Sequence, residues 1–187
     1  MQLSNTASRK SILILLLSII TPSVFSQNVE VIGDSLFSLM QQERNVHEVQ
    51  SPIFMSDFLC KIARYQADYI FRTGTISHSN PTIGYRSPTE RGETYGLRSG
   101  MGENITVFGY GDETDLEISK HILDNFMNSR GHRIRILGDT HHYLDGTYGD
   151  YYYGHYIILN KKRKLIIVVQ TFLSPYFDSD LELVRNK

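Results

Sequence analysis

The spacing of apolar residues changes in the last third of this chain, and that change limits the folds open to it. In several segments between residues 32 and 137, apolar side chains recur at three-to-four spacing, which indicates amphipathic helices. Residues 152–159 and 165–172 are instead near-continuous apolar and aromatic runs, separated by the polar residues 160–164. Such a pair of runs predicts a β-hairpin with a buried face. Helices followed by a mainly antiparallel sheet predict an α+β domain, layered around one core.

The first half of the chain predicts two helices and a long connection. Apolar spacing places the first helix at about residues 32–43. The second opens at Ser56 or Asp57, either of which can cap a helix N-terminus, and it ends near Gly74, a residue that favours helix C-termini. Residues 79–102 are rich in Gly, Pro, Ser and Thr, so we expect a long irregular connection there.

The middle of the chain predicts a strand and two further helices. Residues 103–108 alternate and are rich in β-branched side chains, which favours a short strand. The sequence Thr-Asp-Leu-Glu at 114–117 is a capping box, which predicts a third helix that stops near Asn128. Ser129 is placed to cap a short fourth helix with His132 in its first turn.

The N-terminal segment has the pattern of a secretory signal peptide. Arg9 and Lys10 precede an apolar run at 12–20 that is too short to span a bilayer. Small residues follow, and cleavage after Ser26 would remove residues 1–26. We therefore expect a secreted protein, extracellular or periplasmic, with no stable membrane anchor after cleavage. An uncleaved anchor is the alternative.

Charge and cysteine content argue against a nucleic-acid-binding protein and against a domain stabilised by disulfides. Of the 19 Lys and Arg residues, Arg9 and Lys10 lie in the leader, so 17 basic groups remain against 20 acidic ones and the formal charge becomes −3. The basic run at 161–164 falls on the expected hairpin tip, and no basic stripe suggests nucleic acid as a partner. Cys60 is the only cysteine, so an exported chain of this kind has no intrachain disulfide.

Three polar residues on separate segments form the candidate site. His78 follows the second helix, Glu103 begins the predicted strand and His132 begins the fourth helix. Two neutral imidazoles and a carboxylate are donors that zinc accepts. No local metal-binding motif joins these residues, so the fold would have to bring them together. Taken singly, each histidine also fits an ordinary loop or capping residue.

Several motifs, taken in order, resemble the cysteine-rich secretory, antigen 5 and pathogenesis-related (CAP) superfamily in its bacterial, disulfide-free branch. The resemblance covers about residues 34–172. It rests on Gln-Glu-Arg at 42–44, Ile-Ser-His-Ser at 76–79, Ser-Pro-Thr-Glu-Arg at 87–91, Gly-Glu-Asn-Ile at 102–105, Asn-Ser-Arg-Gly-His at 128–132 and Val-Gln-Thr-Phe at 169–172.

The resemblance implies an α-β-α sandwich with helices on both faces of the sheet and a cleft lined by histidines and acids. Some members bind zinc or another divalent metal there. Carried over by position, the cleft residues are His78, Glu103, Ser129 and His132, and the metal ligands are His78 and His132. Ser129 stands where many eukaryotic members have a second acid, so the set carried over here has one carboxylate fewer than theirs. The domain would span residues 27–172, followed by a surface tail at 173–187.

Three hypotheses about function follow. The first is a secreted binding domain, without enzymatic activity, that takes a small apolar, lipid-like ligand or an extracellular protein or cell-wall component. The second is a metal-dependent, peptidase-like hydrolase in which Glu103 acts as general base toward a water held by His78 and His132. The third is a purely structural role, in which these side chains pin the connection 79–102.

Overall fold

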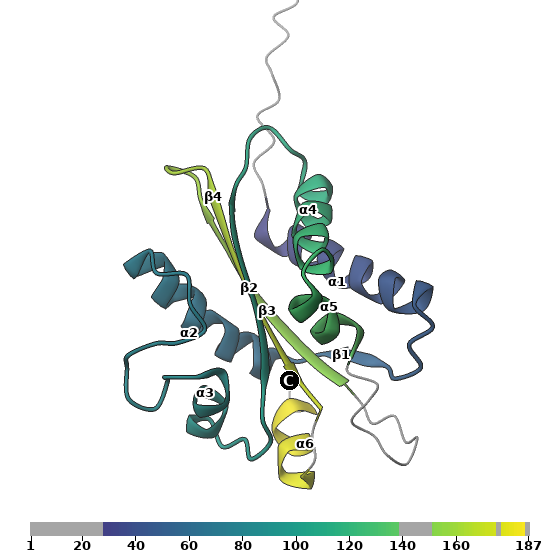
Figure 1. The fold of residues 1–187 in the computed structure, drawn as a ribbon, viewed down its shortest axis with the longest axis vertical. Coiled ribbons are helices and arrows are strands. Elements are labelled where there is room, and N and C mark those ends of the chain that lie inside the picture. Colours follow the sequence, from purple (N-terminus) through teal and green to yellow (C-terminus); the bar gives the residue numbers. More distant parts are fainter. Residues whose placement is uncertain (1–27, 139–150, 175–176, 186–187) are drawn as a thin grey trace, which may run out of the picture.

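The computed structural model describes residues 28–138, 151–174 and 177–185. The predicted signal peptide, residues 1–26, lies outside the described residues. Six helices and four strands fill the described ranges (Figure 1). In chain order they are α1 (Val29–Val46), β1 (Ile53–Met55), α2 (Asp57–Thr73), α3 (Pro88–Thr94), β2 (Gly102–Gly109), α4 (Asp115–Met127), α5 (Arg130–Leu137), β3 (Tyr151–Asn160), β4 (Leu165–Leu173) and α6 (Asp178–Arg185).

The four strands form one mixed sheet in the order β1-β3-β4-β2. β3 and β4 are the predicted hairpin, and β2 pairs antiparallel with β4. β1 pairs parallel with β3. The sheet is therefore mainly but not purely antiparallel. The sequence did not predict β1, because three residues are too few to show an alternating pattern.

Helices cover both faces of the sheet (Figure 1), as the α-β-α prediction requires. α2 packs against β3 and β4 on one face, while α1, α4 and α5 lie on the other. The larger core cluster joins α1 and α4 to the sheet and contains Leu36, Phe126, Tyr153 and Phe172. The chain is thus an α+β sandwich with apolar clusters on both sides of the sheet. Within residues 28–138, 151–174 and 177–185, no helix is long and apolar enough to cross a bilayer.

One glycine sets how closely α2 approaches the sheet. A Cβ added at Gly154, in the middle of β3, would overlap backbone atoms of Leu59 and Cys60 in the first turn of α2. The hydroxyl of Thr171 on β4 donates to the carbonyl of Leu59 at 3.0 Å. Helix backbone therefore lies directly on strand backbone here, with no side chain between them.

Local signals determined the ends of the predicted helices. The Ser56 side chain accepts a hydrogen bond from the backbone N–H of Leu59, and α2 ends at Gly74 with a φ of 70°. α4 begins with the predicted capping box between Thr114 and Glu117. Both helices are confirmed within a residue or two of the positions expected from their caps.

Two segments differ from the sequence prediction. Residues 79–102 are not wholly irregular, because α3 begins at Pro88 and its N-cap Ser87 accepts from the N–H of Glu90 at 3.1 Å. The predicted surface tail, 173–187, contains α6, in which Asp180 and Val184 are buried. The Asp180 carboxylate accepts from the backbone N–H groups of Arg98 and Ser99, so hydrogen bonds satisfy this buried acid.

Candidate functional site

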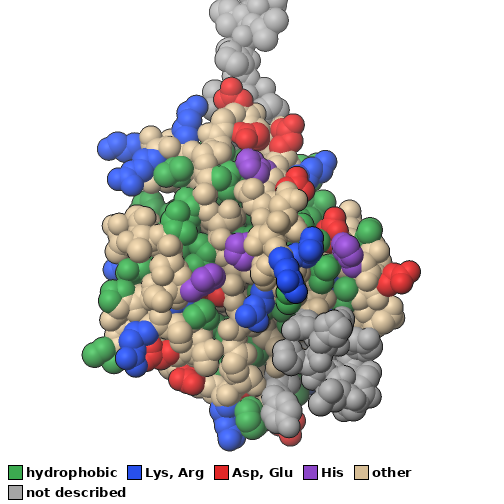
Figure 2. All heavy atoms as spheres, in the orientation of Figure 1, with side chains coloured by type: hydrophobic (Ala, Val, Ile, Leu, Met, Phe, Trp, Pro, Cys, Tyr) green, Lys and Arg blue, Asp and Glu red, His purple; other side chains and the backbone are tan. Residues whose placement is uncertain are grey.

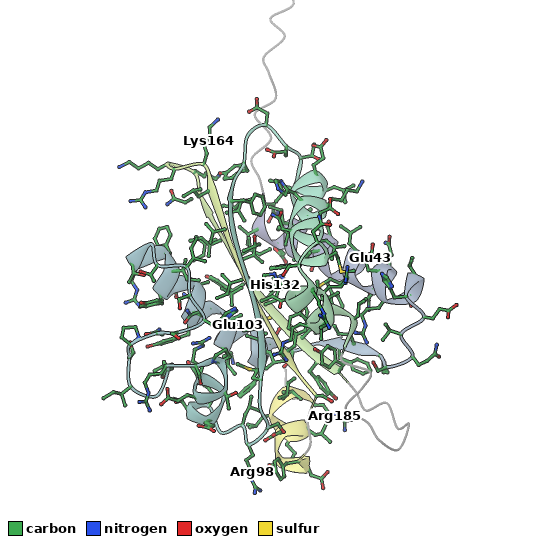
Figure 3. All side chains as sticks on the ribbon, viewed as in Figure 1. Glu43, Arg98, Glu103, His132, Lys164 and Arg185 are labelled. Carbon is green, nitrogen blue, oxygen red and sulfur yellow. The ribbon has the colours of Figure 1, made fainter. Side chains whose placement is uncertain are left out.

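The edge strand β2 carries the two residues that organise the site. Successive side chains of a strand point to opposite faces, so Glu103 and Asn104 face different layers of the sandwich. Glu103 contacts His78, and the side-chain amide of Asn104 donates to the carbonyl of His132 at 3.1 Å. Figure 3 labels Glu103 and His132 near the middle of the molecule. One strand therefore holds both histidine segments, which come from opposite sides of the sheet.

The Glu103 carboxylate is buried and occupied at both oxygens. Oε1 lies 2.9 Å from Nδ1 of His78, and Oε2 forms an ion pair with the guanidinium of Arg91. The side chains of Glu103 and Arg91 are both 0% exposed, whereas that of His78 is 52% exposed. A buried charge pair of this kind persists because each partner compensates the other. Glu103 is thus placed to orient the ring of His78 from its buried side.

The Glu103 contacts also set which nitrogen of His78 carries the proton. An ionised carboxylate only accepts hydrogen bonds, so Nδ1 of His78 is the donor in this pair. In the neutral ring, the lone pair then resides on Nε2, at the opposite edge of the imidazole. This is the arrangement in which a carboxylate orients a histidine that binds a metal through its other nitrogen.

The loop that carries His78 is held from beneath by two further side chains. Nη1 of Arg91 donates to the carbonyls of His78 and Tyr85, at 3.2 Å and 3.1 Å. The amide of Gln66, which is buried in α2, donates to the carbonyl of Ser77 at 2.6 Å. The position of His78 therefore depends on α2, α3 and β2 together.

His132 has an apolar support instead. It lies in the first turn of α5, half-buried, with its ring 5.3 Å from that of Phe126 in an edge-to-face contact. Burial, and then the nearby His78, lower the pKa of His132. Within the described ranges, neither ring nitrogen of His132 has a hydrogen-bond partner. Burial therefore favours the neutral form of the imidazole, which carries a lone pair on one ring nitrogen.

Ser129 occupies the N-cap position of α5, as predicted, but its hydroxyl does not cap. Its carbonyl accepts from the N–H of Arg133 at 2.8 Å, and its side chain makes no capping hydrogen bond. No group of three or more His, Cys, Asp and Glu side chains among the described residues is arranged to hold a metal ion. The candidate donors at the site are therefore the imidazole nitrogens of His78 and His132, and nitrogen is a ligand type that zinc accepts.

Two cavities in the described part of the chain lie away from the imidazoles. One, of about 590 Å³, is lined by the end of α1 and by residues 49–55. The other, of about 470 Å³, is lined by Tyr65, Asp68, Phe71 and Arg72 on α2. Figure 2 shows histidine side chains at the surface of the molecule instead. Neither cavity is the predicted cleft around His78 and His132.

The sequence prediction missed Arg91 as part of the site. Arg91 ends the motif Ser-Pro-Thr-Glu-Arg, but nothing in the spacing of that motif shows that the arginine side chain turns inward onto Glu103. The available signal was local: Ser87 followed by Pro88 and Glu90 is a helix start, which fixes the direction in which Arg91 leaves α3.

Comparison with known proteins gives structural matches. An outer surface protein from Borrelia burgdorferi superimposes with a TM-score of 0.59 at 18% identity, covering 78% of this chain and 93% of that one. An extracellular protein containing an SCP domain from Bacillus anthracis str. Ames superimposes with a TM-score of 0.54, also at 18% identity. That match covers 82% of this chain and 44% of the other, so this chain spans less than half of that protein. No family model and no curated protein matches the sequence.

Proposed function

We propose that this chain, which has a CAP/SCP-like fold, is a secreted binding domain that recruits an extracellular partner through the imidazoles of His78 and His132. The signal-peptide pattern of residues 1–26 supports export. The two structural neighbours are described as an outer surface protein and an extracellular protein, which is in keeping with the same location.

The contact between His78 and Glu103 carries this proposal. A general base must reach a water with a free oxygen, but the Glu103 side chain is 0% exposed and both of its oxygens are bonded to protein groups. The geometry therefore favours Glu103 as a support for His78 over Glu103 as the base of a hydrolase. His78, whose side chain is 52% exposed, is the group that meets an incoming molecule.

A divalent cation such as zinc fits the two imidazoles. His78 would hold it through Nε2, since Nδ1 is bonded to Glu103, and His132 would hold it through a ring nitrogen. When bound, the ion would offer a Lewis-acid position to an oxygen or nitrogen of the partner. Two protein ligands would leave half of a tetrahedral coordination shell open, so the site would bind the ion weakly and the partner would complete the shell.

The exposure of His78 favours a partner at the surface over a lipid-like ligand enclosed at the site. Two cavities, of about 590 Å³ and 470 Å³, are lined by other residues, and neither includes an imidazole of the pair. A polar contact to His78 and His132 suits an exposed group of an extracellular protein or cell-wall component.

The test is a calorimetric titration of zinc into the protein that cells export from the full-length gene. We expect one zinc ion per wild-type chain and at least a tenfold loss of affinity when His78→Ala and His132→Ala are combined. His47→Ala is the matched control, because His47 is an exposed histidine at the end of α1 and should leave binding unchanged.

Two results would contradict the proposal. Unchanged zinc affinity in the double variant would show that the imidazoles are not the ligands. Retention of the wild-type protein inside the cell would mean that it does not meet an extracellular partner. Peptidase activity that disappears in Glu103→Gln, with zinc binding intact, would instead establish the hydrolase.

A further inference from the structure

We propose that Arg91 is the positioning residue of this site and that it fixes which nitrogen of His78 faces the partner. This inference rests on the proposed function, since it concerns how that site is prepared for its ligand. Arg91 is 0% exposed and contacts both the carboxylate that orients the His78 ring and the backbone of His78 itself. It pairs with the Glu103 carboxylate, which holds the His78 ring, and it bonds the His78 carbonyl, which holds the backbone.

The separate directions of these contacts require a guanidinium. Nη2 of Arg91 is directed to Glu103, while Nη1 is directed to the carbonyls of His78 and Tyr85. Nε is buried and has no partner among the described residues, so the two terminal groups make all the contacts found there. A lysine ammonium has the same charge but presents its donors from a single atom, so it cannot span both positions.

The consequence is a histidine prepared in one tautomer. Because the Arg91 guanidinium pairs with the Glu103 carboxylate and holds it against Nδ1, the neutral His78 ring has its proton on Nδ1 and its lone pair on Nε2. Without the guanidinium fork, the carboxylate and the His78 carbonyl can move independently. The ring would then sample both tautomers and several orientations. A smaller fraction of molecules would present the Nε2 lone pair to a metal ion or partner.

The test reads the His78 tautomer directly in metal-free protein. Long-range nitrogen-to-proton NMR correlations at pH about 8.5, where imidazoles of ordinary pKa are neutral, distinguish the two tautomers. We expect wild-type His78 to be the Nδ1–H form and Arg91→Lys to give a mixture. Arg86→Lys is the matched control, because Arg86 lies five residues earlier and forms its ion pair with Glu90 at the surface.

Zinc titration of the same proteins supplies the second readout. Arg91→Lys should lower zinc affinity by about 10- to 100-fold, as expected when a partner that orients a metal-binding histidine is changed. Arg86→Lys should leave it unchanged. The melting temperature of each variant is measured alongside, so that a general loss of folding is recognised.

The outcomes separate this inference from the proposed function. An Nε2–H tautomer in the wild type overturns the inference even if no Arg91 variant folds. A wild-type Nδ1–H tautomer that persists unchanged in folded Arg91→Lys also overturns it. If wild-type protein binds no zinc but its tautomer changes in Arg91→Lys, the positioning role stands and the metal part of the proposed function fails.

Discussion

The two histidines of the site are held by opposite kinds of support. Beneath His78 lie a carboxylate and a guanidinium, both 0% exposed, which fix the ring by a directed hydrogen bond. Beside His132 lies the ring of Phe126 in an edge-to-face contact, and burial lowers the pKa of the imidazole. One support acts through a directed hydrogen bond and the other through apolar burial. The two rings are thereby held by different means, and each means fails differently when it is disturbed.

Removing the guanidinium should have the largest effect on the protein. Arg91→Met leaves the Glu103 carboxylate buried without its cation, and breaking such a pair costs about 3–5 kcal/mol. The free energy of unfolding from urea denaturation should fall by that amount. Arg91→Met combined with Glu103→Gln removes both charges and should recover most of the loss. A double variant as unstable as the single one would show that packing, and not charge, accounts for the effect.

A third histidine extends the comparison to a more deeply buried ring. The His155 ring lies against Gly33 of α1, Nδ1 has no partner among the described residues, and burial lowers the pKa of His155 to about 4. The unfolded chain binds this proton near pH 6.5, whereas the folded chain binds it only near pH 4. The contribution of His155 to the free energy of unfolding is therefore fully present above pH 6.5 and is lost as the pH falls toward 4.

The expected loss attributable to His155 is at most about 3 kcal/mol. Urea denaturation at pH about 7 and about 4.5, on either side of the ordinary histidine pKa, measures it, with His155→Met as the non-titrating reference. The difference in unfolding free energy between the two pH values should be smaller in His155→Met. Equal differences in both proteins would mean that His155 titrates normally in the folded state.

Replacing the aromatic support should change His132 and leave His78 untouched. Phe126→Leu removes the ring from a fully buried position and should cost about 1–3 kcal/mol. Better hydration should also raise the pKa of His132 toward its ordinary value, as followed by an NMR titration of its ring protons. The tautomer of His78 serves as the internal control. A shift in both histidines would show that the two supports are coupled.

The smallest expected effect comes from adding a carboxylate at the N-cap of α5, three residues before His132. Ser129→Asp places an acid at the N-cap of α5, where the serine hydroxyl makes no capping bond and aspartate is well tolerated. With a third donor beside His132, zinc affinity should rise about tenfold, or about 1.4 kcal/mol. Asn128→Asp, one residue earlier and exposed, is the control for net charge. No gain over that control would place Ser129 outside the coordination shell.

Much of the fold could be predicted from the sequence because its signals were local. Ser56 and Gly74 mark the ends of α2, and the capping box marks the start of α4. The pairing of β1 with β3 could not be predicted, because nothing within three residues encodes a parallel partner far along the chain. The polar composition of residues 178–185 favours a surface tail, because the sequence does not show the backbone N–H groups that hold Asp180.

The sequence names candidate residues for the site but does not reveal their contacts. His78, Glu103 and His132 were expected near one another, and the structure joins His78 to Glu103 directly and His132 through Asn104. That Glu103 supports His78 and does not face a water depends on Arg91, whose inward direction arises from tertiary packing. Residue types show which chemistry is available, but contacts decide which atom performs it.

The close packing of α2 on β3 has an evolutionary consequence. Since any side chain at Gly154 would overlap the backbone of the first turn of α2, a substitution there would lift the helix and, with it, Gln66 and the loop that carries His78. Homologues that keep the imidazole pair should therefore keep glycine at this position even where every neighbouring residue has drifted. A glycine remote from the ligand would then be as diagnostic of a working site as the histidines themselves.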